Sequence, residues 1–207
     1  MSISYGSDQQ AIAANVNSFA WRGQDRWKDL RSLFAEQANI SVSWYSGSIE
    51  GFIAASEKIS SSSVALTKHW LGVPRVIVNG DKALAETDIV IMLRSAVGPL
   101  ELDVTTYARF FDRFIRDSAG CWKVESRVAI YEKDRIDSVG PSLLCWMINR
   151  LARYGRHPEE LRHLAYGMER QGMTLSKDVV TNGSARERQL KSDARAWLGA
   201  EQEILLP

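Results

Sequence analysis

Short turns between long β-rich runs constrain the fold of this sequence more than any other feature. Asn79-Gly80 joins two of these runs, and both residues tolerate positive φ, which makes the pair a strong hairpin signal. Gly98-Pro99 and residues 118–120 supply two more turns. A parallel connection needs a dozen residues or more, so these turns require antiparallel neighbours. We therefore expect an antiparallel meander built from residues 71–78, 84–93, 102–115 and 122–131.

Helical periodicity dominates the sequence before this meander. Gly23 has low helix propensity and lets the chain turn between two helices, and residues 40–44 alternate like a short strand. Ser48 is a candidate cap for a third helix. Helices followed by an antiparallel meander predict an α+β fold. The expected apolar helix faces comprise Ile12, Val16 and Phe19; Trp27, Leu30, Leu33 and Phe34; and Ile49, Phe52, Ile53 and Ile59.

Helical spacing returns after Gly140-Pro141, and a charged helix is expected over residues 185–198. We expect residues 5–135 to form the main domain and residues 136–207 to form a helical C-terminal extension. The sequence leaves open whether this extension packs on the sheet or on a second subunit. Its two apolar segments carry Leu144, Met147, Ile148 and Leu151, and then Leu161, Leu164, Ala165 and Met168.

The charge composition argues against a nucleic acid or an anionic membrane as partner. The 26 basic and 25 acidic residues give a net charge of +1, and no concentrated basic run stands out. No window approaches the roughly 18 apolar residues of a membrane span, and no secretory signal is visible in residues 1–10. We therefore expect a soluble cytoplasmic protein that binds neither nucleic acid nor membrane.

The sequence shows no pattern typical of a metal or nucleotide site. Cys121 and Cys145 stand apart without CxxC spacing, which favours reduced structural cysteines. His157 and His163 have too few further ligands at helical spacing to hold zinc. Neither a glycine-rich phosphate loop nor a Ser–His–Asp order is visible. We expect no metal and no cofactor.

Three segments carry a family resemblance: FAWRGQDRWKDLRSLFAE, TKHWLGVPRVIVNGDKALAETDIVI and VTTYARFFDRFIRDSAGCWKVESRVAIYEKDRID. In this order they resemble the NTF2-like superfamily, and most closely its branch of SnoaL-like proteins, scytalone dehydratase and hexachlorocyclohexane dehydrochlorinase. The resemblance covers about residues 8–135. It implies an α+β cone, with N-terminal helices on a curved antiparallel sheet around one pocket. It also implies a homodimer, because a second copy covers the outer face of the sheet in the family.

The resemblance implies a catalytic histidine at His69. Lyases of the family use a His–Asp pair, and their His stands in a short segment that His69-Trp70 matches. Imidazole titrates near pH 6.5, so a neutral His69 could take a proton and return it to a leaving group. The partner carboxylate is expected at Gly23, where this sequence has none. Asp25 is the nearest replacement, although two helical positions rotate a side chain by about 200°; it is equally a candidate helix N-cap.

Aromatic side chains near His69 are candidates for ligand binding. Trp44 and Tyr45 end a strand that borders the pocket in the family, and Trp70 follows the histidine. Ordinary core packing explains Trp44 and Tyr45 equally well. The last strand also contributes pocket residues in the family, which makes Tyr131 a candidate hydrogen-bond donor.

The strand at 102–115 has two alternating faces, of which one lines the pocket and the other meets helices or a partner. We name Tyr107 and Phe111 as candidate ligand contacts. An inward Arg109 is either a clamp for an oxyanion or carboxylate, or a salt-bridged structural residue. The two faces carry Tyr107, Arg109 and Phe111, and Thr106, Ala108 and Phe110.

These features predict a cofactor-independent lyase that acts on a small hydrophobic, aromatic or alicyclic hydroxylated compound. In this hypothesis His69 removes a proton, a hydroxyl group leaves, and Arg109, Tyr45 or Tyr131 holds the developing oxyanion. A carbon–carbon cleavage that releases a small aldehyde needs the same base. Two rivals remain, an isomerase or polyketide-cyclase-type enzyme in the same pocket and a non-catalytic small-molecule binding protein. The missing carboxylate at Gly23 favours the second rival.

Overall fold

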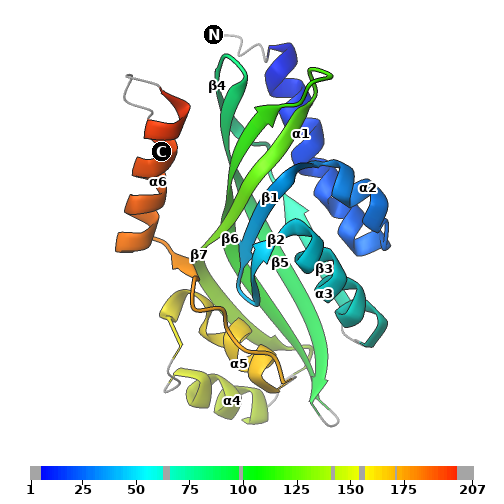
Figure 1. Cartoon of the computed structure of the whole chain (residues 1–207). Coiled ribbons are helices and arrows are strands. Elements are labelled where there is room, and N and C mark those ends of the chain that lie inside the picture. Colours follow the sequence, from blue (N-terminus) through cyan, green and yellow to red (C-terminus); the bar gives the residue numbers. More distant parts are fainter. Residues whose placement is uncertain are drawn as a thin grey trace.

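A computed structural model describes residues 6–62, 66–97, 100–140, 143–153, 157–170 and 172–199 (Figure 1). Its first half contains α1 (Ser7–Ser18), the 3-10 helix η1 (Phe19–Gln24), α2 (Trp27–Ser32), β1 (Phe34–Val42), β2 (Tyr45–Ser48) and α3 (Ile49–Ser62). The meander follows as β3 (Leu66–Leu71), β4 (Arg75–Asn79), β5 (Lys82–Val97), β6 (Leu100–Arg116) and β7 (Trp122–Ser138). The chain continues with α4 (Leu143–Arg153), η2 (Glu159–Leu161), α5 (Arg162–Arg170), β8 (Val180–Thr181) and α6 (Ala185–Leu198).

One sheet organises the molecule. Its strands follow the order β2-β1-β7-β6-β5-β3, with β4 paired to β5 and β8 paired to β7. The predicted antiparallel meander is confirmed, because β5, β6 and β7 pair antiparallel along most of their length. β1 pairs in parallel with β7, although about 90 residues separate the two strands in the sequence. This pairing brings the N-terminal helices next to the meander. Helices packed on a curved antiparallel sheet make this an α+β fold, as predicted.

The Asn79-Gly80 hairpin is confirmed as the connection between β4 and β5, with φ of +59° at Gly80. The prediction of a single strand over residues 71–78 was wrong, because this region contains the end of β3 and most of β4. The interruption falls at residues 72–74, where Pro74 has no N–H to donate to a ladder. His69 lies inside β3. The predicted turn at Gly98-Pro99 lies outside the described residues.

The second predicted helix was too long. It ends at Ser32, and Phe34 begins β1, because residues 34–42 pair with β2 and β7. Its start also differs from the prediction, since Arg26 occupies the N-cap position and Asp25 adopts a left-handed conformation with φ of +54°. The third helix begins at Ile49, directly after Ser48, as expected.

The main core lies between the sheet and the N-terminal helices. α1 buries Ile12 and Val16, α2 buries Leu30, and α3 buries Ile49 and Phe52. Alternate residues of β6 face this core, which is why the strand repeats with a period of two. The shared cluster includes Ala108, Phe110, Phe114, Val124 and Ala129.

The C-terminal helices pack on the sheet in two places. α5 contacts β6 and β7 beside the main core, whereas α6 lies on the other side of the sheet from α1–α3 (Figure 1). Part of the outer face, which the sequence analysis expected a second copy to cover, is therefore covered by this chain itself. The second hydrophobic cluster, between α6 and the sheet, contains Leu84, Phe111, Ile130, Val180, Ala194 and Leu198.

β7 links the meander to the C-terminal helices. It runs without interruption from Trp122 to Ser138, so the expected division at residue 135 falls inside this strand. Among the described residues, no helix has the length and apolar character needed to span a membrane.

Candidate functional site

An apolar cavity of about 120 Å³ lies between the sheet, η1, α3 and α5. Its wall is largely aromatic and aliphatic, with a few polar groups at separate points. An engineered cavity of roughly 150 Å³ admits benzene, so this volume suits a ligand built on a single ring. The apolar wall residues of the main core include Phe19, Val42, Trp44, Phe52, Ile91 and Phe110.

The C-terminal extension completes the cavity wall. Leu164 and Met168 of α5 line it, and Met173 follows in the segment after that helix. The predicted helical repeat of Leu164 and Met168 gave their helix an apolar face, but no sequence signal showed what this face would cover. A backbone hydrogen bond of 2.7 Å, from the Ser176 N–H to the Ser43 carbonyl, ties the extension to the tip of the β1–β2 hairpin.

His69 reaches the cavity from β3, opposite Ile91 of β5 in the strand register. The ring is half-buried, and no hydrogen bond joins it to another described residue. Burial, together with the positive charge of Arg22, lowers the pKa of His69 to about 4. The imidazole is therefore neutral at pH 7 and has a lone pair available to accept a proton.

Arg22 is the functional candidate that the sequence analysis missed. It lies in η1 and lines the same cavity as His69. Its guanidinium carbon stands 5.7 Å from the ring centroid of Trp44 and 5.6 Å from that of Phe52. Burial lowers the pKa of Arg22, and its Nε is shut off from solvent without a hydrogen-bond acceptor. The only signal in the sequence was its position beside Gly23, where the resemblance places a catalytic carboxylate.

Gly23 itself is exposed, and a Cβ built there would meet no atom within 4 Å. The fold therefore leaves room for a side chain at this position. Among the described residues that line the cavity there is no Asp or Glu. The cavity thus differs from the family's His–Asp pattern in its chemistry, and steric exclusion at Gly23 does not account for the difference.

Tyr131 is fully buried and brings a hydroxyl group to the cavity wall. Its oxygen accepts a hydrogen bond of 2.7 Å from the Ser43 N–H. Burial raises the pKa of Tyr131, so the phenol keeps its proton at neutral pH. The hydroxyl hydrogen is not used by the bond to Ser43 and is available to a ligand oxygen.

A buried ion pair supports the aromatic wall from behind. Arg127, with 1% exposure, donates hydrogen bonds of 2.8 and 2.7 Å to the Asp112 carboxylate. Its guanidinium carbon lies 4.6 Å from the ring centroid of Phe19 and 4.4 Å from that of Phe110. Both rings line the cavity, so this pair positions the wall without facing the ligand space.

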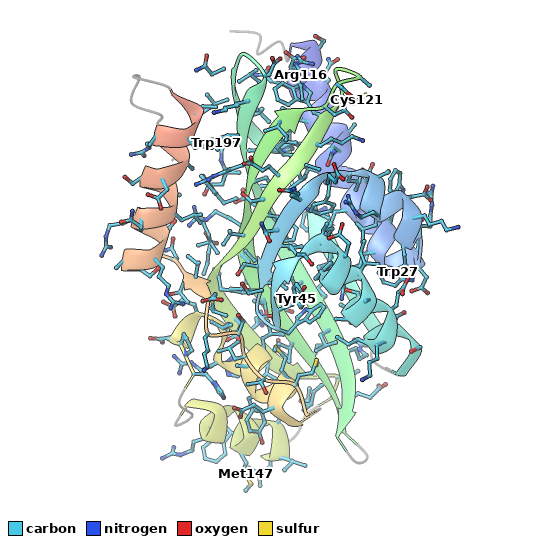
Figure 2. All side chains as sticks on the ribbon, in the orientation of Figure 1. Trp27, Tyr45, Arg116, Cys121, Met147 and Trp197 are labelled. Atoms are coloured by element: carbon cyan, nitrogen blue, oxygen red, sulfur yellow. The ribbon has the colours of Figure 1, made fainter. Side chains whose placement is uncertain are left out.

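Three of the predicted site residues, His69, Trp44 and Tyr131, line the cavity together. Tyr45 packs beside the cavity, with ring centroids 5.9 Å from Trp44 and 5.8 Å from Phe52. Its hydroxyl donates to the Ser48 carbonyl at 2.9 Å, and Figure 2 shows its place on the hairpin strand. These contacts are those of an ordinary packing residue, which is the alternative that we left open for Tyr45.

Asp25 and Trp70 lie outside the cavity. The Asp25 carboxylate is exposed and accepts a hydrogen bond of 2.7 Å from the Ser60 hydroxyl. Trp70 is 68% exposed, because neighbouring residues on a strand point to opposite faces and His69 takes the inner one.

Tyr107, Arg109 and Phe111 also lie outside the cavity, on the outer face of β6. Phe111 belongs to the cluster beneath α6, and the Tyr107 ring stacks with the Lys133 ammonium at 4.9 Å. Arg109 donates hydrogen bonds to Glu86, to Glu132 at 2.6 Å, to Glu187 at 2.9 Å and to Asn182 at 2.7 Å. The structure thus gives Arg109 the salt-bridged environment that we weighed against a clamp. The inner face of β6 is the one that carries Phe110.

Metal ligation finds no support in the described part of the chain, which contains no cluster of three or more His, Cys, Asp or Glu side chains arranged to hold an ion. His163 instead contacts Asp134, with 2.7 Å between the ring Nδ1 and the carboxylate. Asp134 also accepts the His163 and Leu164 backbone N–H groups at 2.7 and 2.8 Å, which fixes the start of α5.

Together, the helix-covered curved sheet and its apolar cavity define an NTF2-like fold with a pocket of small-molecule size. The SnoaL-like domain matches residues 7–128, which is more than half of the chain. The chain therefore belongs to the SnoaL-like family. No curated protein matches it.

Solved structures of similar fold come from several bacteria. A protein provisionally assigned as a scytalone dehydratase from Novosphingobium aromaticivorans is 16% identical, with a TM-score of 0.50 over 64% of this chain and 88% of that chain. A variant of Rv3472 from Mycobacterium tuberculosis, of unknown function, is 14% identical, with a TM-score of 0.51 over 81% and 92%. A provisional NTF2-like dehydratase from Streptomyces avermitilis is 19% identical, with a TM-score of 0.48 over 59% and 95%. At these identities the likeness concerns the fold alone.

Proposed function

We propose that this protein is a cofactor-independent lyase that acts on a small hydrophobic, aromatic or alicyclic hydroxylated compound in the cavity. The observation that carries the proposal is the environment of His69. Its imidazole is neutral at pH 7 and lines an apolar cavity in which the described wall residues include no carboxylate. A neutral imidazole held away from bulk water is suited to removing a proton from carbon.

The leading reaction is a dehydration. His69 removes a proton from a carbon that an adjacent carbonyl or aromatic ring activates. The electron pair of the broken C–H bond forms the new C=C bond as the C–O bond on the neighbouring carbon breaks. The departing hydroxide takes the proton back from the imidazolium, so the products are an alkene and water, and His69 is neutral again.

Tyr131 supplies a second function in this reaction. Its hydroxyl hydrogen is available, and its oxygen is held by the Ser43 N–H. A fixed donor of this kind stabilises oxygen charge that develops in the transition state, and one donor contributes about 3 kcal/mol. A carbon–carbon cleavage that releases an aldehyde could use the same two groups, with His69 taking the hydroxyl proton of the substrate.

A non-catalytic binding protein is the second candidate. The observation that favours it is the lack of a hydrogen bond from any described residue to the His69 ring, since a catalytic histidine is ordinarily oriented by a partner. An isomerase or cyclase in the same pocket would also need a base and an oxyanion donor, but its product would have the mass of its substrate.

Turnover by a His69→Gln variant tests the proposal. Hydroxylated aromatic and alicyclic compounds are incubated with the protein, and products are followed by mass spectrometry for loss of water or of an aldehyde. We expect the variant to lose a factor of about 10² to 10⁴ in kcat while it still binds the ligand. His157→Gln is the matched control, because His157 pairs with Glu169 outside the cavity.

Two outcomes would reject the lyase. Unchanged turnover in His69→Gln removes the base from the reaction, and binding without any turnover by the parent protein favours the binding protein. A product of unchanged mass points to the isomerase or cyclase.

The proposal also includes a cytoplasmic location, as the composition suggests, and a homodimer, as the family resemblance implies. Exposed apolar side chains outside the region covered by α6 support a further contact surface. They include Trp70 and Val73 near the site, and Leu143, Trp146 and Met147 on α4. Figure 2 places Met147 at the far end of the molecule, on the outside of α4.

A further inference from the structure

Arg22 differs from the other deeply placed arginines in lacking a negative partner. Arg109 is surrounded by three carboxylates, and Arg127 is paired with Asp112. The Arg22 side chain, in contrast, has neither an ion pair nor a hydrogen bond with any described residue. Its contacts are the faces of Trp44 and Phe52. The protein therefore places a permanent positive charge in its cavity and leaves that charge uncompensated.

An uncompensated guanidinium in an apolar site is unfavourable, and aromatic stacking offsets only part of the lost hydration. Such an arrangement is retained where a ligand supplies the missing partner. Because Arg22 lines the cavity and its Nε has no acceptor in the described structure, the cavity is the space from which such a partner can approach the guanidinium. The absence of Asp and Glu among the described wall residues leaves the cavity with a net positive charge.

We propose that Arg22 binds the carboxylate of a small ring-bearing acid, whose ring lies against the aromatic and methionine wall. A guanidinium presents two parallel N–H donors that match a carboxylate in shape and charge. One cation balances one carboxylate, whereas a phosphate ester carries nearly two charges at neutral pH and would remain partly uncompensated. The cavity volume of about 120 Å³ admits a single ring.

This inference deepens the proposed function. The carboxylate site itself follows from Arg22, and only its effect on catalysis rests on the proposed lyase activity. The charge of Arg22 already affects the imidazole of His69, so the two groups lie within electrostatic reach of each other. A carboxylate on Arg22 would bring carbon atoms near that anchor toward His69. It would also offset the charge that now disfavours protonation of the ring, so substrate binding would strengthen the base.

The test compares benzoate with benzamide, a neutral molecule of almost the same shape, by isothermal titration calorimetry at pH 7. We expect the parent protein to bind benzoate at least tenfold more tightly than benzamide. Arg22→Met keeps a long unbranched side chain but removes the charge, so the preference should fall to about one. Arg22→Lys keeps the charge without the paired donors and should retain part of the preference.

Arg26→Met is the matched control. Arg26 also stacks on an aromatic ring, Trp21 at 4.6 Å, but it is exposed and paired with Asp29 at 2.7 Å. This variant should keep the full preference for benzoate. Circular dichroism melting curves of all variants establish that each one is folded before titration.

The outcomes separate this inference from the lyase proposal. His69→Gln should preserve the preference for benzoate even if it abolishes turnover, because the anchor is Arg22. Equal binding of benzoate and benzamide, an unchanged preference in Arg22→Met, or no benzoate binding up to 10 mM (roughly the upper limit for a specific ligand) would overturn the inference. Tighter binding of phenyl phosphate than of benzoate would overturn the assignment to a carboxylate.

Discussion

At the scale of single residues, two nitrogen bases with opposite properties share one cavity. His69 is held neutral and Arg22 is held charged, and the same apolar wall acts on both. Burial alone would favour the neutral form of either side chain. The guanidinium stays protonated because its ordinary pKa is far above 7. The ordinary pKa of the imidazole is close to 7, so the same burial is enough to keep the ring neutral. One environment therefore holds a neutral imidazole beside a charged guanidinium, and these are the two groups that our proposals use as base and anion anchor.

The protonation of His69 gives a prediction about pH. Its pKa is lowered to about 4 in the folded protein, from 6.5 in the unfolded chain, so between these values the unfolded chain binds more protons. The free energy of unfolding should therefore fall as pH decreases from about 6.5 to 4 and level off below, by up to about 3 kcal/mol from this residue. Urea denaturation across this range checks the slope, and His69→Gln should lack this contribution.

Nuclear magnetic resonance of the His69 ring checks the same value directly. Arg22→Met should raise the pKa of His69, although not to 6.5, because burial is the larger cause of the shift and persists in the variant. A titration near pH 6.5 in the parent protein would contradict the description of the cavity as apolar around this ring.

Some site residues were predictable from the sequence and others were not. His69, Trp44 and Tyr131 were found because the resemblance assigns pocket positions to their segments, and all three line the cavity. Arg22 was not found, because a charged residue in a helix ordinarily faces solvent. Its burial depends on Phe52 and Trp44, which reach it only through tertiary packing.

At the scale of elements, α6 is fastened to the outer face of the sheet by a charged cluster. Glu187 lies in the first turn of α6 and accepts a hydrogen bond of 2.6 Å from the Gly183 N–H. It also accepts one from Arg109 at 2.9 Å, and the Lys191 ammonium is 3.1 Å away. The Ser184 hydroxyl in turn accepts a hydrogen bond from the Glu187 N–H and caps the helix. Glu187 therefore takes part both in the cap and in the attachment of α6 to the sheet.

Replacing Glu187 by Gln should loosen α6. Burial alone would raise the pKa of Glu187, but the bonds from Gly183, Lys191 and Arg109 hold it below the ordinary value. The stabilisation is therefore present at neutral pH and lost as pH falls through that lowered pKa. We expect Glu187→Gln to cost about 2 kcal/mol at pH 7. Hydrogen exchange in residues 185–198 should accelerate.

An exposed glutamate provides the comparison for this variant. Glu57 is exposed on α3, and Glu57→Gln should change the free energy of unfolding by less than about 0.5 kcal/mol. Equal stability and equal exchange in both variants would show that the cluster does not hold α6.

Element positions were harder to predict than element types. The helical spacing over 185–198 correctly indicated α6, yet an amphipathic pattern does not specify which surface the helix will cover. Strand ends followed the turns where glycine or proline marked them. The boundary at Phe34 was missed because an apolar residue there fits the end of a helix and the start of a strand equally well.

At the scale of the whole molecule, the meander was the most predictable feature. Three short connections permitted only antiparallel neighbours, and the long register of β5, β6 and β7 follows from them. The parallel pairings of β1 and β8 with β7 left no comparable local signal, because they join segments far apart in the sequence. The two-sided packing of the C-terminal helices depends on the same long-range contacts.

Sedimentation velocity at micromolar concentration tests the expected homodimer. We predict a species of twice the chain mass of 23.2 kDa. The physical reason is the exposed apolar surface that α6 leaves uncovered, including Trp146, which is 58% exposed on α4. A single 23.2 kDa species would contradict the prediction and would mean that α6 alone suffices to cover the sheet.

The thioether side chains of Met168 and Met173 in the cavity wall have a chemical consequence. Unbranched and polarizable, they can change shape around substituents on a bound ring. They are also the groups in the wall most easily attacked by peroxide, which turns a thioether into a polar sulfoxide. Oxidation would make the wall of the cavity more polar without modifying Arg22 or His69. A methionine sulfoxide reductase would restore the thioethers.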